Sequence, residues 1–202
     1  SLASTETFNI KFKRAAIVNL FFDNFTAGAG NWTITNDGGT CVWAIANTSA
    51  RYLMPAASVL PVLAADVDLC GSGTTLLSTA TVASSINCTN TSNISLEWDN
   101  DWRFLASGDI ARVEFSTNGG TTWTQVVQWA GVDRRTTHEF YTLPAATGAA
   151  ALKVRFVSIQ PGWDWWWAID NVQIKGDRAT GVDEYGTGVP VEFALSQNYP
   201  NP

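Results

Sequence analysis

Short stretches of alternating apolar and polar residues, separated by Gly, Asn and Thr, recur along the whole chain. Alternation with a period of two places apolar side chains on one face of a strand, whereas helical periodicity is almost absent. The clearest case is residues 110–127, where two alternating stretches flank Asn118-Gly119-Gly120, residues that accept the positive φ angles of a tight turn. The sequence therefore predicts an all-β fold, a two-sheet antiparallel jelly-roll sandwich.

The chain length sets the domain organisation. A chain of 202 residues can form one sandwich with a full core, but it is short for two. We expect an N-terminal arm over residues 1–14, the sandwich over residues 15–176, and a polar, glycine-rich tail over residues 177–202. The pattern predicts strands at residues 7–13, 15–22, 31–35, 41–46, 62–67, 75–84, 93–105, 109–117, 121–129, 137–141, 151–160 and 165–175.

Composition excludes two classes of partner. Apolar residues make up 46% of the chain and charged residues only 15%, so the solvent-facing positions are mostly Thr, Ser, Asn and Gly, as suits an extracellular protein. The net charge is −6 and no run of Lys or Arg occurs, which argues against nucleic acid. No stretch approaches the roughly 18 consecutive apolar residues of a membrane helix. We therefore expect neither nucleic-acid binding nor membrane insertion.

The chain has three cysteines, Cys41, Cys70 and Cys88, in surroundings rich in Gly, Thr and Asn. Their spacing matches no CxxC or Cys/His zinc pattern. One disulfide and one free thiol is the simplest arrangement, and we favour a bond between Cys70 and Cys88. The other pairings, and three reduced buried cysteines, remain open alternatives.

A run of aromatic residues marks the end of the predicted sandwich. Period two places Trp163, Trp165 and Trp167 on one face of a strand and Trp166 on the other. One face must pack in the core, while the other can stack on sugar rings or dock on a neighbouring subunit. In the alternative, both faces are covered within the fold.

Signals of catalysis are weak. The only histidine, His138, lies in a polar stretch without a GxSxG or HExxH motif. Asp99 and Asp101 resemble the carboxylate pair of a glycosidase. However, Asn100 between them suggests a bend that would turn the two side chains apart. We therefore expect a protein that is not an enzyme.

The end of the chain carries a family resemblance. Residues 193–202, Phe-Ala-Leu-Ser-Gln-Asn-Tyr-Pro-Asn-Pro, resemble the opening of the C-terminal sorting domain of proteins exported by the type IX secretion system of Bacteroidetes-like bacteria. The resemblance implies export from a Gram-negative bacterium to the outer cell surface or the medium. The tail over residues 177–202 would then be a linker that leads into this sorting signal.

The middle of the chain carries a second resemblance. Residues 93–99, 111–123 and 163–174 resemble MAM-like jelly-roll modules, including the choice-of-anchor type. This resemblance implies an accessory adhesive or binding domain. Related modules often hold structural calcium through a carboxylate of the final strand. The resemblance therefore implies that Asp170 is a calcium ligand, with Asp23 or Asp99 as partner, and it implies no other cofactor.

Two functions follow from these observations. In the first, the chain is a secreted, non-catalytic structural or adhesive subunit that forms homo-oligomers or polymers. Its arm, with Phe8, Ile10 and Phe12 alternating on one strand face, would add a strand to a neighbouring sandwich. In the alternative, the chain is the carbohydrate-binding module of a larger secreted enzyme, and its partner is a surface polysaccharide. The sequence favours the first function.

Overall fold

The computed structural model describes residues 12–48 and 51–183. No helix of that part of the chain is long and apolar enough to span a membrane. The strands are β1 (Phe12–Asp23), β2 (Trp32–Asn36), β3 (Ala44–Ala46), β4 (Val62–Asp66), β5 (Leu76–Val82), β6 (Thr91–Arg103), β7 (Ile110–Ser116), β8 (Thr124–Trp129), β9 (Arg134–Thr142), β10 (Lys153–Gln160) and β11 (Trp166–Asp183). The helices are α1 (Val67–Cys70) and the short 3-10 helix η1 (Pro144–Ala146).

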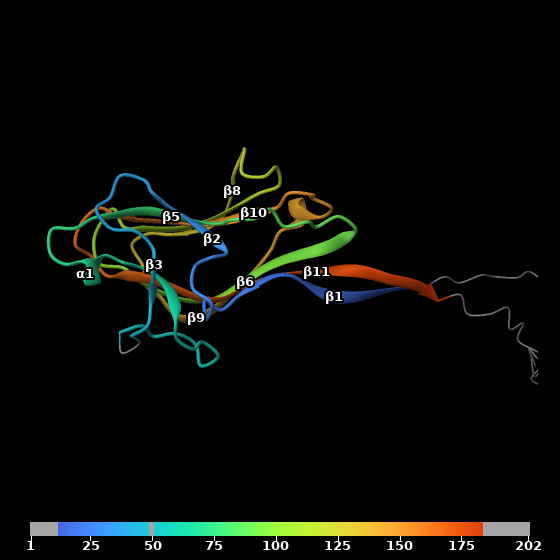
Figure 1. Cartoon of the computed structure of the whole chain (residues 1–202), viewed down its shortest axis with the longest axis horizontal. Helices are drawn as coiled ribbons and strands as arrows, with labels where there is room; N and C mark the ends of the chain where they lie inside the picture. The colour runs from blue at the N-terminus through green and yellow to red at the C-terminus, as the bar shows by residue number, and fades with distance from the viewer. Residues whose placement is uncertain (1–11, 49–50, 184–202) are drawn as a thin grey trace, which may run out of the picture. The chain divides into compact units, whose positions relative to one another are not determined.

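The strands form two antiparallel sheets packed face to face (Figure 1). Sheet A has the order β3-β4-β11-β6-β9, and β1 also pairs with β11. Sheet B has the order β2-β5-β10-β7-β8. The predicted two-sheet sandwich is confirmed. The pattern predicted it because alternation on antiparallel strands gives each sheet one apolar face, which must pack against the other sheet.

The chain divides into two compact units. Residues Ile17–Arg178 form one unit, which contains the body of both sheets. The other unit comprises Ser1–Ala16 and Ala179–Pro202, of which the structure describes the first residues of β1 and the last of β11. Since β11 runs to Asp183, residues 177–183 belong to a strand and not to the linker that the sequence predicted.

The core between the sheets is dominated by large aromatic side chains. The indole of Trp167 is fully buried and lies 5.2 Å from the Trp43 ring, 5.7 Å from the Phe156 ring and 6.1 Å from the Trp102 ring, measured between centroids. These offset and edge-on contacts are the favoured geometries for aromatic pairs. Trp167 therefore connects β11 to both sheets at the centre of the molecule.

The predicted hairpin is present as β7 and β8. Gly119 and Gly120 adopt φ angles of 72° and 98°, which only glycine tolerates without strain. The Asn118 Oδ1 atom accepts a hydrogen bond of 2.9 Å from the Thr122 amide, closing the turn. The sequence pattern located this element because turn chemistry and strand alternation agree there.

The predicted disulfide is wrong. The structure joins Cys41 to Cys70, with 6.4 Å between their Cα atoms, and leaves Cys88 as a buried free thiol. Cys70 ends α1, and the backbone amide of Cys41 donates to the Thr75 carbonyl just beyond it, 3.0 Å away. The seven-residue strand β5 separates Cys70 from Cys88 and carries the chain roughly 20 Å to the other end of the sandwich. A Cys70–Cys88 bond is therefore out of reach.

Replacing either Cys41 or Cys70 by Ser should lower the free energy of unfolding by about 3 kcal/mol, because the disulfide restricts the unfolded chain. Chemical denaturation of the purified chain measures this loss. Cys88→Ser is the matched control. Thiol titration of the denatured, unreduced protein should detect one thiol in the wild type and none in this variant. A mixture of disulfide pairings by peptide mapping would contradict the assignment.

Candidate functional site

The outer face of sheet A, which points away from sheet B, carries a row of acidic and aromatic side chains. Along β11, Trp167 and Ile169 point into the main core, whereas Trp166 and Ala168 belong to a second apolar cluster on the outer face. The β6 strand contributes carboxylates to the same face, because Asp101 pairs with Ala168 across the two strands. Alternation on two neighbouring strands thus builds this face.

The segment of residues 51–61 crosses this outer face and is tied down by its carboxylates. The Leu53 amide donates to Asp101 Oδ2 at 2.8 Å, and the Ser58 hydroxyl donates to Asp99 Oδ2 at 2.7 Å. Figure 1 shows the segment in cyan, hanging beside sheet A. Buried carboxylates need such donors, since an unpaired charge away from water is costly. The middle of the outer face is therefore covered.

Trp166 lies at the centre of an arginine cluster. Its ring is 3% exposed, and its indole Nε1 donates to Asp101 Oδ2 at 2.8 Å. Three guanidinium groups lie over the ring, those of Arg51 at 4.9 Å, Arg103 at 4.9 Å and Arg135 at 5.4 Å from its centroid. Cation–π attraction and the ion pair between Arg135 and Asp101 hold this cluster together.

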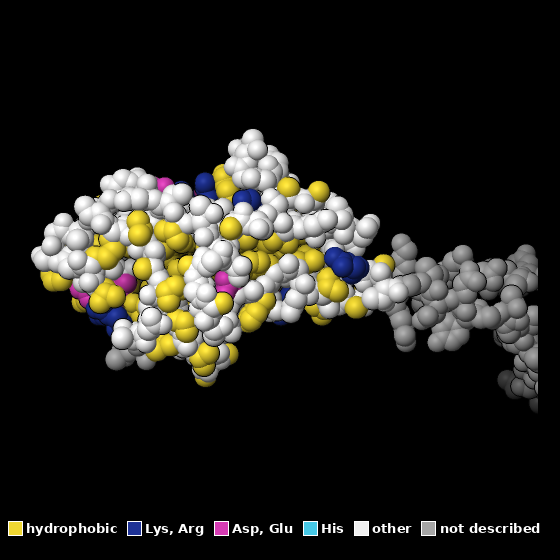
Figure 2. Space-filling model, in the orientation of Figure 1, with side chains coloured by type: hydrophobic (Ala, Val, Ile, Leu, Met, Phe, Trp, Pro, Cys, Tyr) yellow, Lys and Arg dark blue, Asp and Glu magenta, His cyan; other side chains and the backbone are white. Residues whose placement is uncertain are grey.

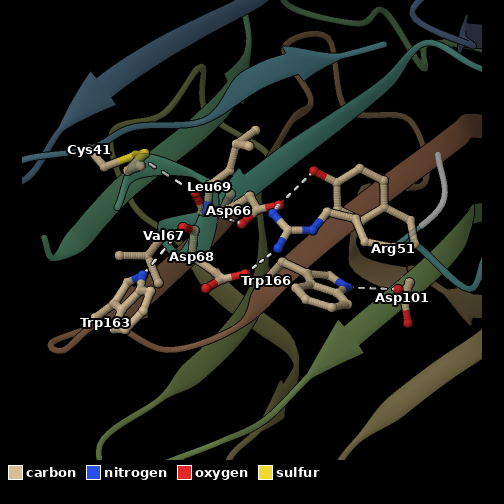
Figure 3. Close-up of polar contacts among 12 residues, drawn as sticks. Cys41, Arg51, Asp66, Val67, Asp68, Leu69, Asp101, Trp163 and Trp166 are labelled. Atoms are coloured by element: carbon tan, nitrogen blue, oxygen red, sulfur yellow. Dashed lines mark hydrogen bonds and ion pairs between the residues drawn. A yellow bond between two sulfur atoms is a disulfide. The ribbon is translucent and has the colours of Figure 1, made fainter. Parts of the chain in front are cut away.

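Arg51 links the covering segment to the end of β4 (Figure 3). Its guanidinium pairs with Asp66 at 2.9 Å and also with Asp68. The Tyr52 hydroxyl donates to Asp66 Oδ2 at 2.7 Å. Burial, together with the neighbouring Asp66 carboxylate, raises the pKa of Tyr52 far above its usual value. Tyr52 is therefore a neutral hydrogen-bond donor at physiological pH, and these contacts form a fixed structural network.

Two tryptophans beside this cluster reach solvent. Trp163 lies in the loop between β10 and β11, is 50% exposed, and donates from its indole Nε1 to the Asp68 carbonyl at 3.2 Å. Figure 3 shows Trp163 beside α1, apart from the ring of Trp166. Trp165 is half-buried, with the Arg103 guanidinium 3.8 Å from its ring centroid. The Trp163 ring is thus fixed by the hydrogen bond of its indole nitrogen, and the Trp165 ring is covered on one face by the Arg103 guanidinium.

The same end of the sandwich carries further exposed apolar side chains. They come from different connections between strands: Leu69 is 63% exposed, Val132 is 52% exposed and Leu105 is 49% exposed. Figure 2 shows hydrophobic side chains at the surface of the end where α1 lies. Scattered single apolar residues are ordinary on a surface, so the exposed tryptophan is the feature that distinguishes this end. We call Trp163, Trp165 and Arg103 the loop-end site.

A groove of about 480 Å³ lies at another part of the outer face of sheet A. Its rim includes Phe140, 57% exposed, and Ile17, 75% exposed. A Lys175–Glu97 ion pair of 3.0 Å lies in its lining. The groove therefore offers one aromatic ring beside an ion pair and the Asp177 carboxylate, and it is a second candidate site.

The structure separates the four tryptophans predicted to form a ligand or interface surface. Trp163 is exposed and Trp165 is half-buried, but Trp166 and Trp167 are 3% and 0% exposed. Trp166 is covered because the segment over residues 51–61 packs on it, and Trp167 lies in the core. Buried rings cannot stack on an incoming ligand, so the predicted role is wrong for Trp166 and Trp167 and stays a prediction for Trp163 and Trp165.

The acidic pair that resembled a glycosidase site is occupied by the protein's own donors. Asp101 is fully buried and accepts from Arg135, the Leu53 amide and Trp166. The β6 strand continues through Asn100 without the expected bend. Because its oxygens are taken, the Asp101 carboxylate cannot approach a scissile bond.

The histidine contacts the other carboxylate of this pair. Asp99 receives the Ser58 hydroxyl and lies 2.8 Å from His138 Nδ1. The serine and the histidine are therefore joined through the carboxylate rather than to each other. Nucleophilic catalysis by serine needs the hydroxyl bonded to the imidazole, which this arrangement does not provide.

The two carboxylates predicted for calcium have different surroundings. Asp23 accepts from the Phe25 amide and from Trp32 Nε1, at 2.8 and 2.9 Å. Asp170 accepts from the amides of Val59 and Asn171, at 3.2 and 2.8 Å. The two share no hydrogen-bond partner, so their pairing in one site is not seen.

The alternative calcium partner of Asp170 is Asp99. Asp99 lies directly across the strand pair from Asp170. In the parts of the chain that are described, no group of three or more His, Cys, Asp or Glu side chains is placed to hold a metal ion.

Of the three residues predicted to form the self-assembly face of the N-terminal arm, Phe8 and Ile10 lie outside the described residues, and Phe12 is the first residue of β1.

Sequence reasoning missed the arginines that surround Trp166. Arg51 and Arg135 lie in stretches where no apolar alternation drew attention to them, and Arg103 is the last residue of β6. The available signal was the alternation of acidic residues between the tryptophans of β6, which placed carboxylates on one face and required cations there. The arginine cluster could be found only by asking which cations neutralise these carboxylates.

Comparison with known proteins identifies the fold. No protein-family model and no curated protein matches the chain. Among solved structures, the K3 cleaved adhesin domain of Lys-gingipain from Porphyromonas gingivalis w83 is similar with a TM-score of 0.53 and 12% sequence identity, over 79% of this chain and 99% of that chain. The K2 cleaved adhesin domain of Lys-gingipain is similar with a TM-score of 0.52 and 15% identity, over 76% and 96%.

A third similar structure is TmCBM61 in complex with β-1,4-galactotriose. Its TM-score is 0.50 and its sequence identity 11%, over 75% of this chain and 93% of that chain. At this level of identity the likeness establishes a shared β-sandwich fold and does not transfer a ligand. The chain is thus a β-sandwich domain with the fold of adhesin and carbohydrate-binding domains.

Replacing Trp166 by Ala should lower the free energy of unfolding by about 3 kcal/mol or more, because the change leaves a cavity and removes the indole donor of buried Asp101. Trp163→Ala is the matched control and should change it by less than about 1 kcal/mol, since that ring is half exposed. Urea denaturation of both variants measures the difference. Equal losses would contradict the placement of the two rings.

Stability should fall as the pH rises from about 4 to about 6, in part because of Asp170. Burial, and to a lesser degree the neighbouring Asp99 carboxylate, raise the pKa of Asp170 to about 6. The folded protein therefore binds this proton more tightly than the unfolded chain does, and ionisation costs stability on the order of 2 kcal/mol. Denaturation of the wild type and Asp170→Asn across this range tests it. The variant should show a weaker pH dependence, and an unchanged one would contradict the assignment.

Proposed function

We propose that this chain is a non-catalytic polysaccharide-binding module of an extracellular protein, and that the loop-end site contacts the sugar. Trp163 is the residue that carries the proposal. Its ring is half exposed, although its indole nitrogen is already bonded within the protein. An exposed aromatic face stacks on the C–H groups of a sugar ring, and a ring fixed in advance loses little entropy on binding.

The neighbours of the two tryptophans supply the polar groups that a sugar requires. The side chains of Arg51 and Asp68 are 28% and 19% exposed, and Arg103 lies over the half-buried Trp165. Charged groups of this kind donate to and accept from hydroxyl groups, which fixes the orientation of a sugar stacked on a ring. The site thus combines an apolar platform with donors and acceptors.

The comparisons support this function over the assembly that the sequence favoured. One similar structure is a module named for carbohydrate binding and solved with a galactotriose. Two others are domains described as adhesins. Binding domains of both kinds act by contact, which agrees with a protein that is not an enzyme. The exposed ring of Trp163 is the feature of this chain that indicates a sugar as its ligand.

Export to the cell surface of a Gram-negative bacterium is part of the proposal. Its support is the resemblance of residues 193–202 to the type IX sorting signal. The Cys41–Cys70 disulfide agrees with an oxidising compartment, since such bonds persist mainly in exported proteins. In this setting the module would attach a secreted protein to polysaccharide.

A second candidate is the adhesive or structural subunit that assembles through its N-terminal arm. The likeness to adhesin domains favours it. In this function Phe8, Ile10 and Phe12 of one copy add a strand to a neighbouring copy. Ordered oligomers that dissociate when residues 1–14 are deleted would select this candidate over the first.

Trp163→Ala and Trp165→Ala should each weaken polysaccharide binding by about tenfold or more, because loss of one stacked ring removes on the order of 1–3 kcal/mol. A glycan array first identifies the sugar, and titration calorimetry then compares the variants with the wild type. Trp163→Ala should retain the wild-type circular dichroism spectrum and melting behaviour. Trp165→Ala should retain the spectrum, and its binding is measured well below its own melting temperature, because this ring packs on Trp166.

Phe140→Ala is the matched control, because it removes an exposed aromatic side chain of the groove and leaves the loop-end site intact. It should bind the sugar as the wild type does. If Phe140→Ala abolishes binding while the tryptophan variants do not change it, the groove is the binding site and the loop-end assignment is wrong. The absence of any glycan ligand for a folded monomer would contradict the proposed function itself.

A further inference from the structure

Two buried carboxyl groups face each other between the loops at the end of the sandwich. Asp109 lies at the end of the loop that connects β6 to β7, and Asp164 lies in the loop that connects β10 to β11. Their residues are only 1% and 5% exposed. The carboxyl groups are within hydrogen-bonding reach of each other. Two anions at this separation repel each other strongly when water is excluded.

The hydrogen-bond donors around the two carboxyl groups do not reach every carboxyl oxygen. Asp109 Oδ2 accepts from the amides of Leu105 and Ala106, at 3.1 and 3.0 Å, and Asp164 Oδ2 accepts from the Gly162 amide at 3.2 Å. In contrast, Asp109 Oδ1 is buried and accepts no hydrogen bond from an N–H or hydroxyl donor of the described residues. No ion pair joins either carboxylate to a Lys, Arg or His side chain among the residues that the structure describes.

The two loops are in direct contact at this point. A Cβ atom added to Gly108 would lie 3.1 Å from the Cγ atom of Pro161, which is closer than ordinary packing allows. Gly108 also has a φ angle of 111°, which favours glycine. The close approach places the two carboxyl groups together, and repulsion between them works against it. A positive charge between them would remove that repulsion.

We propose that Asp109 and Asp164 bind a Ca²⁺ ion that holds the two loops together. The side-chain atoms available as ligands are carboxylate oxygens, which hard cations prefer. Two carboxylates neutralise the charge of one divalent ion. Calcium accepts six to eight oxygens in flexible geometry, so backbone carbonyls of the two loops and water can complete its shell. Magnesium demands a stricter octahedron and is reluctant to lose its water.

The site has a consequence for the exposed rings, because Asp164 lies between Trp163 and Trp165 in the sequence. A cation at Asp164 fixes the loop that carries both tryptophans. The binding of the ion does not depend on any sugar. Its effect on sugar affinity rests on the proposed function, and there we expect chelation to weaken binding.

Titration calorimetry of the chelator-treated full chain with CaCl₂ tests the ion directly. We expect binding of one Ca²⁺ per chain. The melting temperature should rise by about 5 °C when free Ca²⁺ reaches about 100 times its dissociation constant. No binding and no thermal shift would overturn the proposal. A response to Mg²⁺ but not to Ca²⁺ would overturn the choice of ion.

Asp109→Asn and Asp164→Asn should abolish the calcium response. In chelator, both should melt at or above the wild-type temperature, because one charge of the repelling pair is gone and the amide oxygen still accepts the backbone donors. Asp133→Asn is the matched control, since Asp133 is an exposed carboxylate nearby that accepts from the Phe104 amide at 2.7 Å. It should keep the calcium response. A response retained by the Asp109 and Asp164 variants would overturn the proposal.

Two further outcomes separate this inference from the alternatives. If the carboxyl groups instead share a proton, calcium has no effect on the wild type, and Asp109→Asn loses part of the stability that the wild type gains in chelator as the pH falls from 7 to 5. That result would overturn the inference. If calcium binds but Trp163→Ala and Trp165→Ala leave sugar binding unchanged, the cation site stands and the proposed sugar site fails. The two proposals can therefore fail separately.

Discussion

The amide side chain of Asn100 joins three strands of sheet A inside the core. It is fully buried in β6, and its Oδ1 atom accepts from the indole nitrogens of Trp98 at 3.1 Å and of Trp167, on β11, at 2.7 Å. Its Nδ2 atom donates to the Arg134 carbonyl of β9 at 2.6 Å. Buried indole N–H groups favour an acceptor, and Asn100 supplies one for two of the large tryptophans that fill the centre of the sandwich. It also fixes the register of β11 against β6.

That register determines what the outer face of sheet A carries. Since side chains alternate along a strand, placing Asn100 and Trp167 inward turns Asp101 and Trp166 outward. Asp101 then needs donors, and it receives them from Trp166, Arg135 and the Leu53 amide. The segment over residues 51–61 is consequently held across the middle of the face. Ligand contact is left to the loop end and to the groove, where side chains remain exposed.

Strand alternation and turn chemistry were sufficient to predict the fold class and the β7–β8 hairpin, because both are local properties of the chain. Asn100 shows where local reasoning fails. Asn is rare in strands, so its position predicted a bend, whereas tertiary hydrogen bonds hold it inside a continuous strand. The prediction of a Cys70–Cys88 disulfide was wrong for a related reason, since the proximity of Cys41 and Cys70 depends on strand order. For the four tryptophans at residues 163–167, the sequence could not show that the segment over residues 51–61 would cover Trp166.

Two edge strands of sheet A, β3 and β9, are poor templates for the addition of another strand. An incoming strand needs a regular, unpaired edge. In sheet A, β3 is only three residues long, and the edge strand β9 contains Thr136 at a φ angle of 55° and a register shift against β6. Charged residues, among them Arg134 and Arg135, also occupy β9. Such edges resist pairing with another chain. The proposed function requires no strand pairing at these two edges, because it depends on the exposed ring of Trp163, which lies on a loop between two strands.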